Sequence, residues 1–485
     1  MLTRLEVDGF KNLLKFEVDF GPFNCIAGPN GVGKSNIFDA IRFLSLLADN
    51  TITEAARKVR GELETADVRD IFWTDGKDRA NQFRIAAEMI VDSKVVDDIG
   101  RSVDVKSTYL RYEVEIGYEE PELEHGKLGG LVLRKESLHG YSKEQAKERL
   151  CFPYTNEFFD AVIRNRKGGR TFISTEKTEN GPSDIALRVH ANGEAGRRAH
   201  SFPEQIIPLT NTPRTIVGVS SLWADPSILA AKREMQNWRV FAIDPAAIRR
   251  ADPLHADPHL TSKGGHLHAT LYRVALSAAK YDLEPEQMYG FVRTQLAGLE
   301  PVTGLSVKVD PDRQLLMTYV KQRFRGGTLP ARALSDGMLR FLTLAVLSED
   351  PEVHGLVCIE EPENSIHPGK MEALVELLKE IAVETDVAPD DEFPMRQVII
   401  ATHSPYLVQL LLPEDLLIVF EGATRGPFGK PAHVLRCSPL PDTWRSCQSG
   451  RRIGWTRMFD YLFAPPNARV KLPAYLFEDE GSESR

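Results

Sequence analysis

The spacing of apolar residues divides the first third of the chain into strand-like segments. Apolar and polar residues alternate, between polar turns, at 2–7, 16–20, 83–91, 109–118 and 130–138. Alternation with a period of two lets one side of each segment face a core, which is the pattern of half-buried strands. The first two segments predict short strands around a turn at 9–12, and the last three predict an antiparallel β subdomain.

Largely apolar runs occur at 23–27, at 356–361, where the run ends in two carboxylates, and at 397–401, and they are typical of buried parallel strands. Helical periodicity marks 37–47, 228–238, 266–281, 285–299 and 341–347, and hairpins are expected around 171–191 and at 302–309 with 314–321. Buried strands that alternate with helices predict an α/β fold. No heptad array is long enough for a coiled-coil arm.

A phosphate-binding loop stands between the run at 23–27 and the helix at 37–47. Its spacing is G-x-x-x-x-G-K-S, and with one further polar residue it comprises Gly28, Pro29, Asn30, Gly31, Val32, Gly33, Lys34, Ser35 and Asn36. The glycines let backbone N–H groups turn toward phosphate oxygens, and the following helix presents its positive end. We expect Lys34 to reach the β- and γ-phosphates and Ser35 to place its hydroxyl on Mg²⁺. The alternative, a chance glycine-rich turn, does not explain the strand and helix on either side.

Composition narrows the class of protein. The 485 residues carry a net charge of −9, so the chain as a whole is not a polycation built to coat nucleic acid. The five cysteines form no C-x-x-C pair and indicate thiols in a reducing compartment. No apolar run reaches the roughly 18 residues that suggest a membrane span, and the N-terminus resembles no signal peptide. We expect a cytoplasmic protein without a membrane partner.

A second anion-binding helix start is predicted at Leu334-Ser335-Asp336-Gly337, just before the helix at 341–347. Alone, this segment would be an ordinary helix cap formed by Ser335. The buried strand that follows it ends in Glu360 and Glu361. Charges at the end of a buried parallel strand lie where α/β sheets place their ligands. We expect Glu360 to hold Mg²⁺ through its water shell and Glu361 to orient and deprotonate an attacking water.

The third apolar run, at 397–401, is followed by Thr402 and His403. An imidazole at a strand end can donate a hydrogen bond to a γ-phosphate and report its loss. A lone histidine is more often structural, but its place after a P-loop and a carboxylate pair favours function.

Three weaker candidates remain open. Gln82 opens a predicted strand and is a hypothetical nucleotide-sensing glutamine, although a solvated edge residue is commoner. Two basic clusters could contact a nucleic-acid phosphate backbone, although solvated loop charges are the commoner interpretation. They comprise Arg164, Arg166, Lys167 and Arg170, and then Arg197 and Arg198. A metal site is a weak alternative for four irregularly spaced histidines on a polar loop: His255, His259, His266 and His268.

Four motifs in this order, GPNGVGKS, LSDGMLR, VCIEEPENSIHP and IIATHSP, resemble the P-loop, signature, Walker B with D-loop, and switch histidine of the ATP-binding-cassette (ABC) ATPases. More narrowly, the chain resembles the branch that contains RecF, the chromosome-maintenance heads and the OLD nucleases, as well as bacterial ATPases of phage-defence operons. The resemblance covers roughly residues 1–120 and 235–425. One departure is Glu360, where most transporters and chromosome heads have Asp.

The resemblance implies a two-lobed head in which two subunits sandwich two ATP molecules. The P-loop, Glu360, Glu361 and His403 of one subunit would act with Ser335 and Gly337 of the other. Asn364 and Ser365 would form the D-loop between the two sites. ATP would close a homodimer or a higher even oligomer, and hydrolysis would open it.

The expected organisation is α/β: a mixed sheet around the P-loop, an antiparallel β subdomain and a helical insert. The expected boundaries are 1–140 for the first ATPase lobe, 141–235 for a mixed α/β insert, 236–440 for the rest of the core with the signature lobe, and 441–485 for a helical extension with an acidic tail. Two function hypotheses follow. In the first, an ATPase switch subunit controls a separately encoded effector in a phage-defence complex. In the alternative, a RecF-like ATPase binds DNA or DNA ends.

Overall fold

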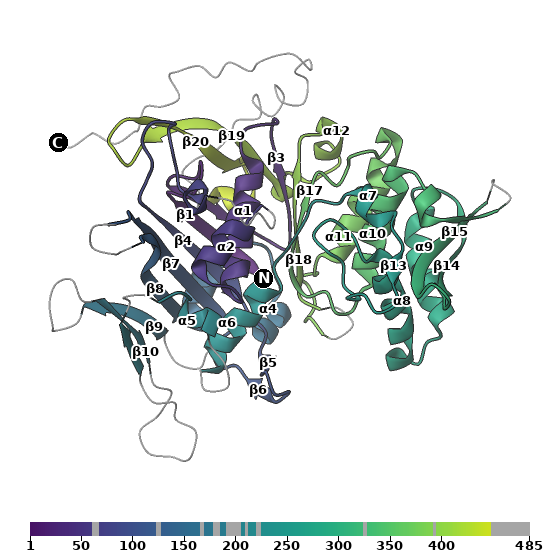
Figure 1. Ribbon diagram of the computed structural model, residues 1–485, viewed down its shortest axis with the longest axis horizontal. Helices are drawn as coiled ribbons and strands as arrows, with labels where there is room; N and C mark the ends of the chain where they lie inside the picture. Colours follow the sequence, from purple (N-terminus) through teal and green to yellow (C-terminus); the bar gives the residue numbers. More distant parts are fainter. Residues whose placement is uncertain are drawn as a thin grey trace.

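A six-stranded sheet runs through the centre of the molecule and carries the P-loop (Figure 1). In this computed structural model the described residues are 1–60, 67–122, 128–164, 169–177, 185–190, 205–208, 212–219, 225–323, 327–390 and 394–447. In sheet order the strands are β12 (Arg239–Phe241), β17 (Gly355–Glu360), β18 (Arg396–Thr402), β3 (Phe23–Ala27), β19 (Leu416–Arg425) and β20 (Pro431–Pro439). Neighbours are parallel except in the β19–β20 hairpin. The three apolar runs that predicted buried strands are β3, β17 and β18, and they lie side by side.

An eight-stranded sheet, antiparallel throughout, forms the second layer of the first lobe. Its order is β11 (Gln205–Pro208), β10 (Ile185–Val189), β9 (Arg170–Lys177), β8 (Gly130–Gly140), β7 (Tyr109–Glu119), β4 (Gln82–Ile90), β1 (Leu2–Asp8) and β2 (Phe16–Asp19). All five strands expected in the first third of the chain belong to it. A short ribbon of β5 (Lys94–Val96) and β6 (Ser102–Asp104) lies apart.

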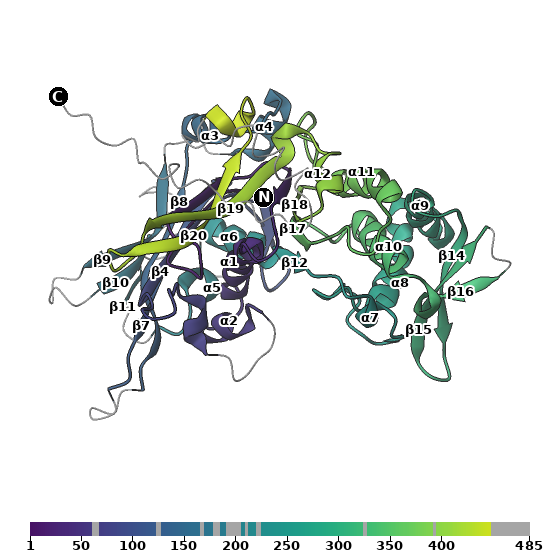
Figure 2. The ribbon, with the colours of Figure 1, turned by 90° about the horizontal axis from the view of Figure 1, so that it is seen from above.

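One hydrophobic core joins the two sheets through α1 (Lys34–Leu47), which lies between them (Figure 2). Along β1, Leu5 and Val7 enter this core, whereas Arg4 and Glu6 point to the other face. This alternation is the period-two pattern that the sequence predicts. The helix that follows the P-loop is therefore anchored by apolar side chains from both layers.

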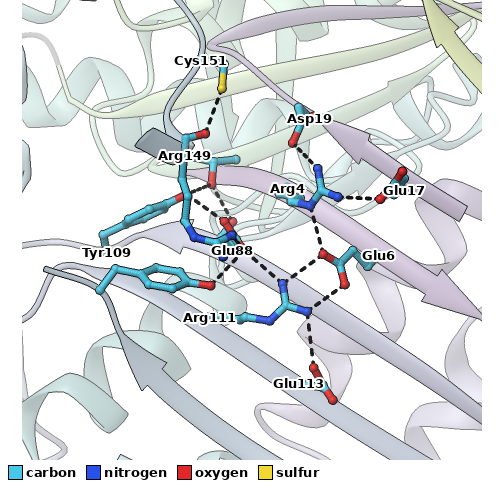
Figure 3. Close-up of polar contacts among 12 residues, drawn as sticks. Arg4, Glu6, Glu17, Asp19, Glu88, Tyr109, Arg111, Glu113, Arg149 and Cys151 are labelled. Carbon is cyan, nitrogen blue, oxygen red and sulfur yellow. Dashed lines mark hydrogen bonds and ion pairs between the residues drawn. The ribbon is translucent and has the colours of Figure 1, made fainter. Parts of the chain in front are cut away.

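The outer face of the eight-stranded sheet carries a network of ion pairs (Figure 3). Arg111 bridges Glu6 at 2.7 Å and Glu88 at 3.0 Å, while Arg4 binds Asp19 at 2.9 Å. Burial alone would raise the pKa of Glu6, but the guanidinium groups of Arg111 and Arg4 lower that pKa to about 2. Each of these charges has a partner, so the network links side chains of β1, β2, β4 and β7.

The segment expected as an insert, 141–235, mixes helices with strands. Its strands β9 and β10 form the hairpin expected around 171–191, and with β11 they extend the eight-stranded sheet. Its helices are α3 (Lys143–Arg149), α4 (Asn156–Val162), α5 (Ile216–Val219) and α6 (Pro226–Gln236), and α2 (Ile52–Lys58) lies nearby beside α1. Residues 448–485, which include most of the expected C-terminal extension, lie outside the described residues.

The second lobe holds the remaining helices and a small antiparallel sheet on the far side of β17 (Figure 1). Its helices are α7 (Pro245–Ile248), α8 (Leu267–Ser277), α9 (Pro285–Ala297), α10 (Asp336–Glu349) and α11 (Met371–Ile381), and α12 (Pro405–Val408) follows β18. Its strands are β13 (Asp252–Pro253), β15 (Leu315–Gln322), β14 (Val302–Asp310) and β16 (Thr328–Pro330). A second core, centred on α10, holds this lobe together.

The expected α/β class is confirmed, and no long coiled coil occurs among the described elements. Within the described ranges, every helix is too short or too polar to cross a lipid bilayer.

Candidate nucleotide-binding site

The carboxyl ends of β3, β18 and β17 meet at one edge of the central sheet because these strands are parallel neighbours. The backbone ties the three following loops together: the Gly28 N–H donates to the Thr402 carbonyl at 3.3 Å and the Glu361 N–H to the Ala401 carbonyl at 2.8 Å. The P-loop, the Glu360–Glu361 pair and His403 therefore share one edge, as the motif order predicts.

The P-loop has the backbone geometry of an anion cradle. Gly31 (φ 79°) and Gly33 (φ 103°) adopt left-handed conformations that favour glycine. Gly33 is the N-cap of α1, and no side chain caps this helix. Uncapped N–H groups at a helix start, with the positive end of the helix dipole behind them, suit phosphate oxygens. The loop therefore fits the nucleotide phosphates that its sequence predicts.

Lys34 is buried at the start of α1, beneath the loop. Its ammonium donates to the Gly28 carbonyl at 2.8 Å and to the Pro29 carbonyl at 2.9 Å. Burial lowers the pKa of Lys34, and the carboxylates of Glu361 and Glu363 are the strongest opposing charges. The lysine that should contact phosphate thus lies in the field of the acids at the same edge.

Asn12 is a site residue that the sequence motifs did not predict. Its amide donates to the Val32 carbonyl at 3.0 Å and accepts from the Asn36 amide at 2.8 Å. A Cβ atom at Gly33 would lie 2.2 Å from Asn12 Nδ2. Asn12, in the turn between β1 and β2, therefore contacts the P-loop and stabilises its conformation. The only signal in the sequence is a polar residue in a tight turn.

Glu361 stands at the centre of the carboxylate side. It follows β17 in a left-handed conformation (φ 47°), which turns its side chain away from the strand direction. Its Oε1 lies 3.0 Å from Nδ1 of His403, and its Oε2 accepts from Asn364 Nδ2 at 2.7 Å. Glu360, the last residue of β17, is half-buried. A base held between an imidazole and an amide is suited to orienting a water molecule.

Glu363 lies within the third motif, but the sequence assigned it no role. It is 5% exposed and accepts a hydrogen bond from the Thr402 hydroxyl, while its Oε2 has no hydrogen-bond partner in the described part of the chain. Burial raises the pKa of Glu363, and the Thr402 hydrogen bond opposes that shift. His403 Nδ1 lies 4.0 Å from Glu363, so the imidazole is flanked by two carboxyl groups.

Ser335 and Gly337 lie in the other lobe from the P-loop (Figure 1). Ser335 caps α10 by accepting from the Met338 N–H at 3.3 Å, and Arg249 holds the adjoining Asp336 at 2.6 Å. A Cβ atom at Gly337 would lie 2.3 Å from the Ser365 carbonyl oxygen. The signature segment is thus packed against the predicted D-loop of its own chain.

The weaker candidates do not join this site. Gln82 is exposed at the start of β4, and Arg170 lies over the Phe172 ring. His259 contacts Asp257 and Glu352, whereas His268 is buried against Thr318. The described residues contain no group of three or more His, Cys, Asp or Glu side chains that could hold a metal ion. Four members of the basic clusters lie outside the described residues: Arg166, Lys167, Arg197 and Arg198.

Two family models match the chain. A model described as "RecF/RecN/SMC N terminal domain" matches residues 1–114, and one described as "AAA domain, putative AbiEii toxin, Type IV TA system" matches residues 224–409. The first contains the P-loop, and the second contains the signature segment, both glutamates and His403. The segment between the two matches includes most of the expected insert.

Curated relatives match mainly short stretches. A DNA replication and repair protein RecF from Phocaeicola vulgatus is 34% identical over 76 residues, which is 16% of this chain and 20% of the relative. RecF from Parabacteroides distasonis is 33% identical over 79 residues, 16% of this chain and 22% of the relative. The chromosome partition protein Smc of Bordetella petrii is 33% identical over 116 residues, 23% of this chain and 9% of the relative. The chain thus spans about a fifth of the length of each RecF relative.

Among solved structures, an Smc head bound to the C-winged helix domain of ScpA has a TM-score of 0.45 at 15% identity, covering 90% of this chain and 98% of that chain. Together with four motifs in order, three of which meet at one edge of the central sheet, the two partial family matches support an ABC-type ATPase of the RecF and SMC branch.

Proposed function

We propose that the chain binds ATP with Mg²⁺, dimerises around it and hydrolyses it. The observation that carries this proposal is the convergence of Lys34, Glu361 and His403 at the carboxyl edge of β3, β17 and β18. An ammonium for phosphate, a carboxylate for water and an imidazole for the γ-phosphate are the groups that phosphoryl transfer to water requires. Ser35 and Glu360 are the proposed Mg²⁺ ligands, since a hydroxyl and a carboxylate suit that ion.

The proposed reaction needs a second subunit. Ser335 and Gly337 lie in the lobe opposite the P-loop, so we assign them to the ATP held by the partner's P-loop. In this arrangement Glu361 takes a proton from the attacking water, and His403 holds the γ-phosphate oxygen. The helix start at Ser335 provides N–H donors for the charge that develops in transfer. Association then precedes hydrolysis.

We further propose that the dimer is a switch subunit that controls a separately encoded effector in an anti-phage defence complex. The family model for residues 224–409 carries the name of a putative toxin of a toxin–antitoxin system, which supports an effector-linked role. The chain's negative net charge also favours a protein partner over a long nucleic-acid surface.

A second candidate function is DNA or DNA-end binding in repair, supported by the RecF relatives of the N-terminal stretch. The discriminating experiment measures two properties of the purified full chain: salt-dependent binding to a DNA duplex, and ATP-dependent association with the products of neighbouring genes in the native host. DNA binding whose affinity falls steeply with salt supports the second candidate. A DNA-independent complex that forms with ATP and is lost in Lys34→Ala supports the switch.

A further inference from the structure

A groove of about 450 Å³ lies on the second lobe, outside the nucleotide site. One wall is the strand β14 at Gly304–Val307, and the opposite wall is formed by α9 together with the end of α8. Tyr272, Leu276 and Tyr289 are among the apolar and aromatic residues that line it. Leu276 is 54% exposed, so the groove leaves a large apolar residue open to solvent.

The strand wall is the edge of a sheet. β14 is the last strand in its sheet, paired with β15 on one side only within the described ranges. The Thr318 N–H donates to His268 at 3.3 Å and so points away from β14. Val307 is opposite Thr318 in the register, and in antiparallel pairs both members then point their backbone groups outward. The Val307 N–H donates to the hydroxyl of Tyr289 on the opposite wall, so an added strand replaces that hydrogen bond. Residues two positions apart share this orientation, so Leu305 also presents its N–H and C=O at the edge.

The helix wall leaves room beside this edge. Gly290 lies within α9, where a glycine weakens a helix, and a Cβ atom there would meet nothing within 4 Å. Internal packing therefore does not require glycine at this position. A polypeptide lying along β14 would pass close to this backbone, and a side chain at residue 290 would obstruct it.

The charges at the two ends of the groove differ in sign. Glu286 is in the first turn of α9, and Arg293 follows seven residues later on the same face, about 10 Å along the helix. An extended chain covers that distance in roughly three residues. A strand that fits would place a basic residue near Glu286 and an acidic one near Arg293, with apolar side chains between them.

We propose that this groove binds an extended segment of a partner polypeptide, which adds to β14 as a further strand. Strand addition between a sheet edge and a helix gives affinity through backbone hydrogen bonds and specificity through alternate side chains. Because α9 packs against α10, whose start carries Ser335, the bound strand lies one helix away from the signature segment. In naming a docking site for the effector, the inference rests on the proposed function.

A random nonapeptide display library, panned against the immobilised full chain without nucleotide, tests the inference. We expect enrichment of peptides with alternating apolar residues flanked by opposite charges. A synthetic selected peptide should bind wild type at least tenfold more tightly than Gly290→Leu. Arg293→Glu should invert the preference for the acidic residue, while Arg313→Glu, in the exposed β14–β15 turn, should leave binding unchanged.

Backbone N-methylation of the selected peptide then separates strand addition from other modes. Methylation should abolish binding at every second residue only, since alternate N–H groups face β14. Equal binding by Gly290→Leu, helical spacing among enriched peptides, or insensitivity to methylation at every position would overturn the proposal. So would self-association of the wild-type chain that Gly290→Leu abolishes, because a second copy would then occupy the groove.

The controls keep this test apart from the ATPase proposal. Lys34→Ala should bind the peptide as wild type does, since the groove does not include the P-loop. If the wild-type chain binds nucleotide but no peptide, the peptide-binding proposal for the groove is rejected and the ATPase proposal stands. Intact peptide binding by a wild-type chain that binds no nucleotide would reject the ATPase proposal alone.

Discussion

His403 Nδ1 lies 3.0 Å from Oε1 of Glu361, although 42 residues separate them in the chain. The contact exists because β17 and β18 are parallel neighbours whose ends lie side by side. The imidazole is also 4.0 Å from Glu363. The two carboxyl groups hold the His403 imidazole in place without a ligand. Loss of the Glu361 carboxylate should therefore remove the proposed base and also displace the histidine proposed to sense the γ-phosphate.

Glu361→Gln should slow ATP hydrolysis by about 100-fold or more, because an amide cannot accept a proton from water. ATP should then remain bound, and the dimer should persist. Phosphate release and light scattering with ATP measure the two effects. Glu421→Gln changes an exposed carboxylate on β19 and should behave as wild type. A wild-type hydrolysis rate in Glu361→Gln would exclude Glu361 as the base.

Lys34→Ala should weaken ATP binding by about 100-fold, since the variant lacks a charged hydrogen bond to phosphate. Calorimetric titration with ATP and Mg²⁺ measures this loss. The matched control is Lys58→Ala on α2, whose ammonium contacts Asn50 at 2.8 Å, outside the P-loop. Unchanged ATP affinity in Lys34→Ala would contradict the assignment of the P-loop.

Mixing two inactive variants tests the shared site. A Ser335→Arg subunit keeps its P-loop, and a Lys34→Ala subunit keeps its signature helix. A mixed dimer should therefore contain one complete site and regain about half of wild-type turnover at best. Steady-state hydrolysis over a range of mixing ratios measures the recovery. Full activity of each variant alone would show that each chain works without its partner.

Most of the catalytic edge could be predicted because its residues follow buried strands in short motifs. Lys34, Glu361 and His403 each lie within a few residues of an apolar run, and parallel pairing brings those runs together. The signature segment could be placed on a helix start for the same local reason. The motif spacing alone does not indicate that it faces a second subunit; that rests on the family resemblance.

The residues that were missed act through tertiary contacts. Asn12 contacts the P-loop across 20 residues of sequence, and nothing around it marks a site. Glu363 follows Glu361 by two positions, but its burial and its hydrogen bond from Thr402, at the end of β18, exist only in the folded chain. The β19–β20 hairpin was also not predicted. It matters to the site because Val419, on β19, lies so close to Gly28 that a Cβ atom there would clash with it.

Asn12→Ala should lower ATP affinity by about tenfold, because two hydrogen bonds that hold Val32 and Asn36 are lost. The catalytic groups stay intact, so turnover at saturating ATP should change less than the apparent KM. A comparison of KM and kcat measures this split. Asn50→Ala removes an amide just beyond the other end of α1 and should affect neither constant. An unchanged KM in Asn12→Ala would show that the loop holds its shape unaided.

Glu136 provides a pH-dependent test of the fold. It is fully buried on β8 and accepts the N–H groups of Ile216 at 2.7 Å and Val217 at 3.0 Å. Burial raises its pKa from 4.5 to about 7, and these hydrogen bonds only partly oppose the shift. The folded state therefore keeps a proton that the unfolded chain loses, so this group destabilises the fold as pH rises through that window.

Glu136→Gln removes this titration while keeping a hydrogen-bond acceptor. Relative to wild type, the variant should gain unfolding free energy between about pH 5 and pH 7, by roughly 3 kcal/mol at most. Urea unfolding at pH 5 and pH 8 measures the difference, with the exposed Glu119→Gln as control. A stability difference that does not change with pH would mean that Glu136 ionises in the folded state as it does in the unfolded chain. The docking of α5 on β8 would then not depend on a neutral carboxyl.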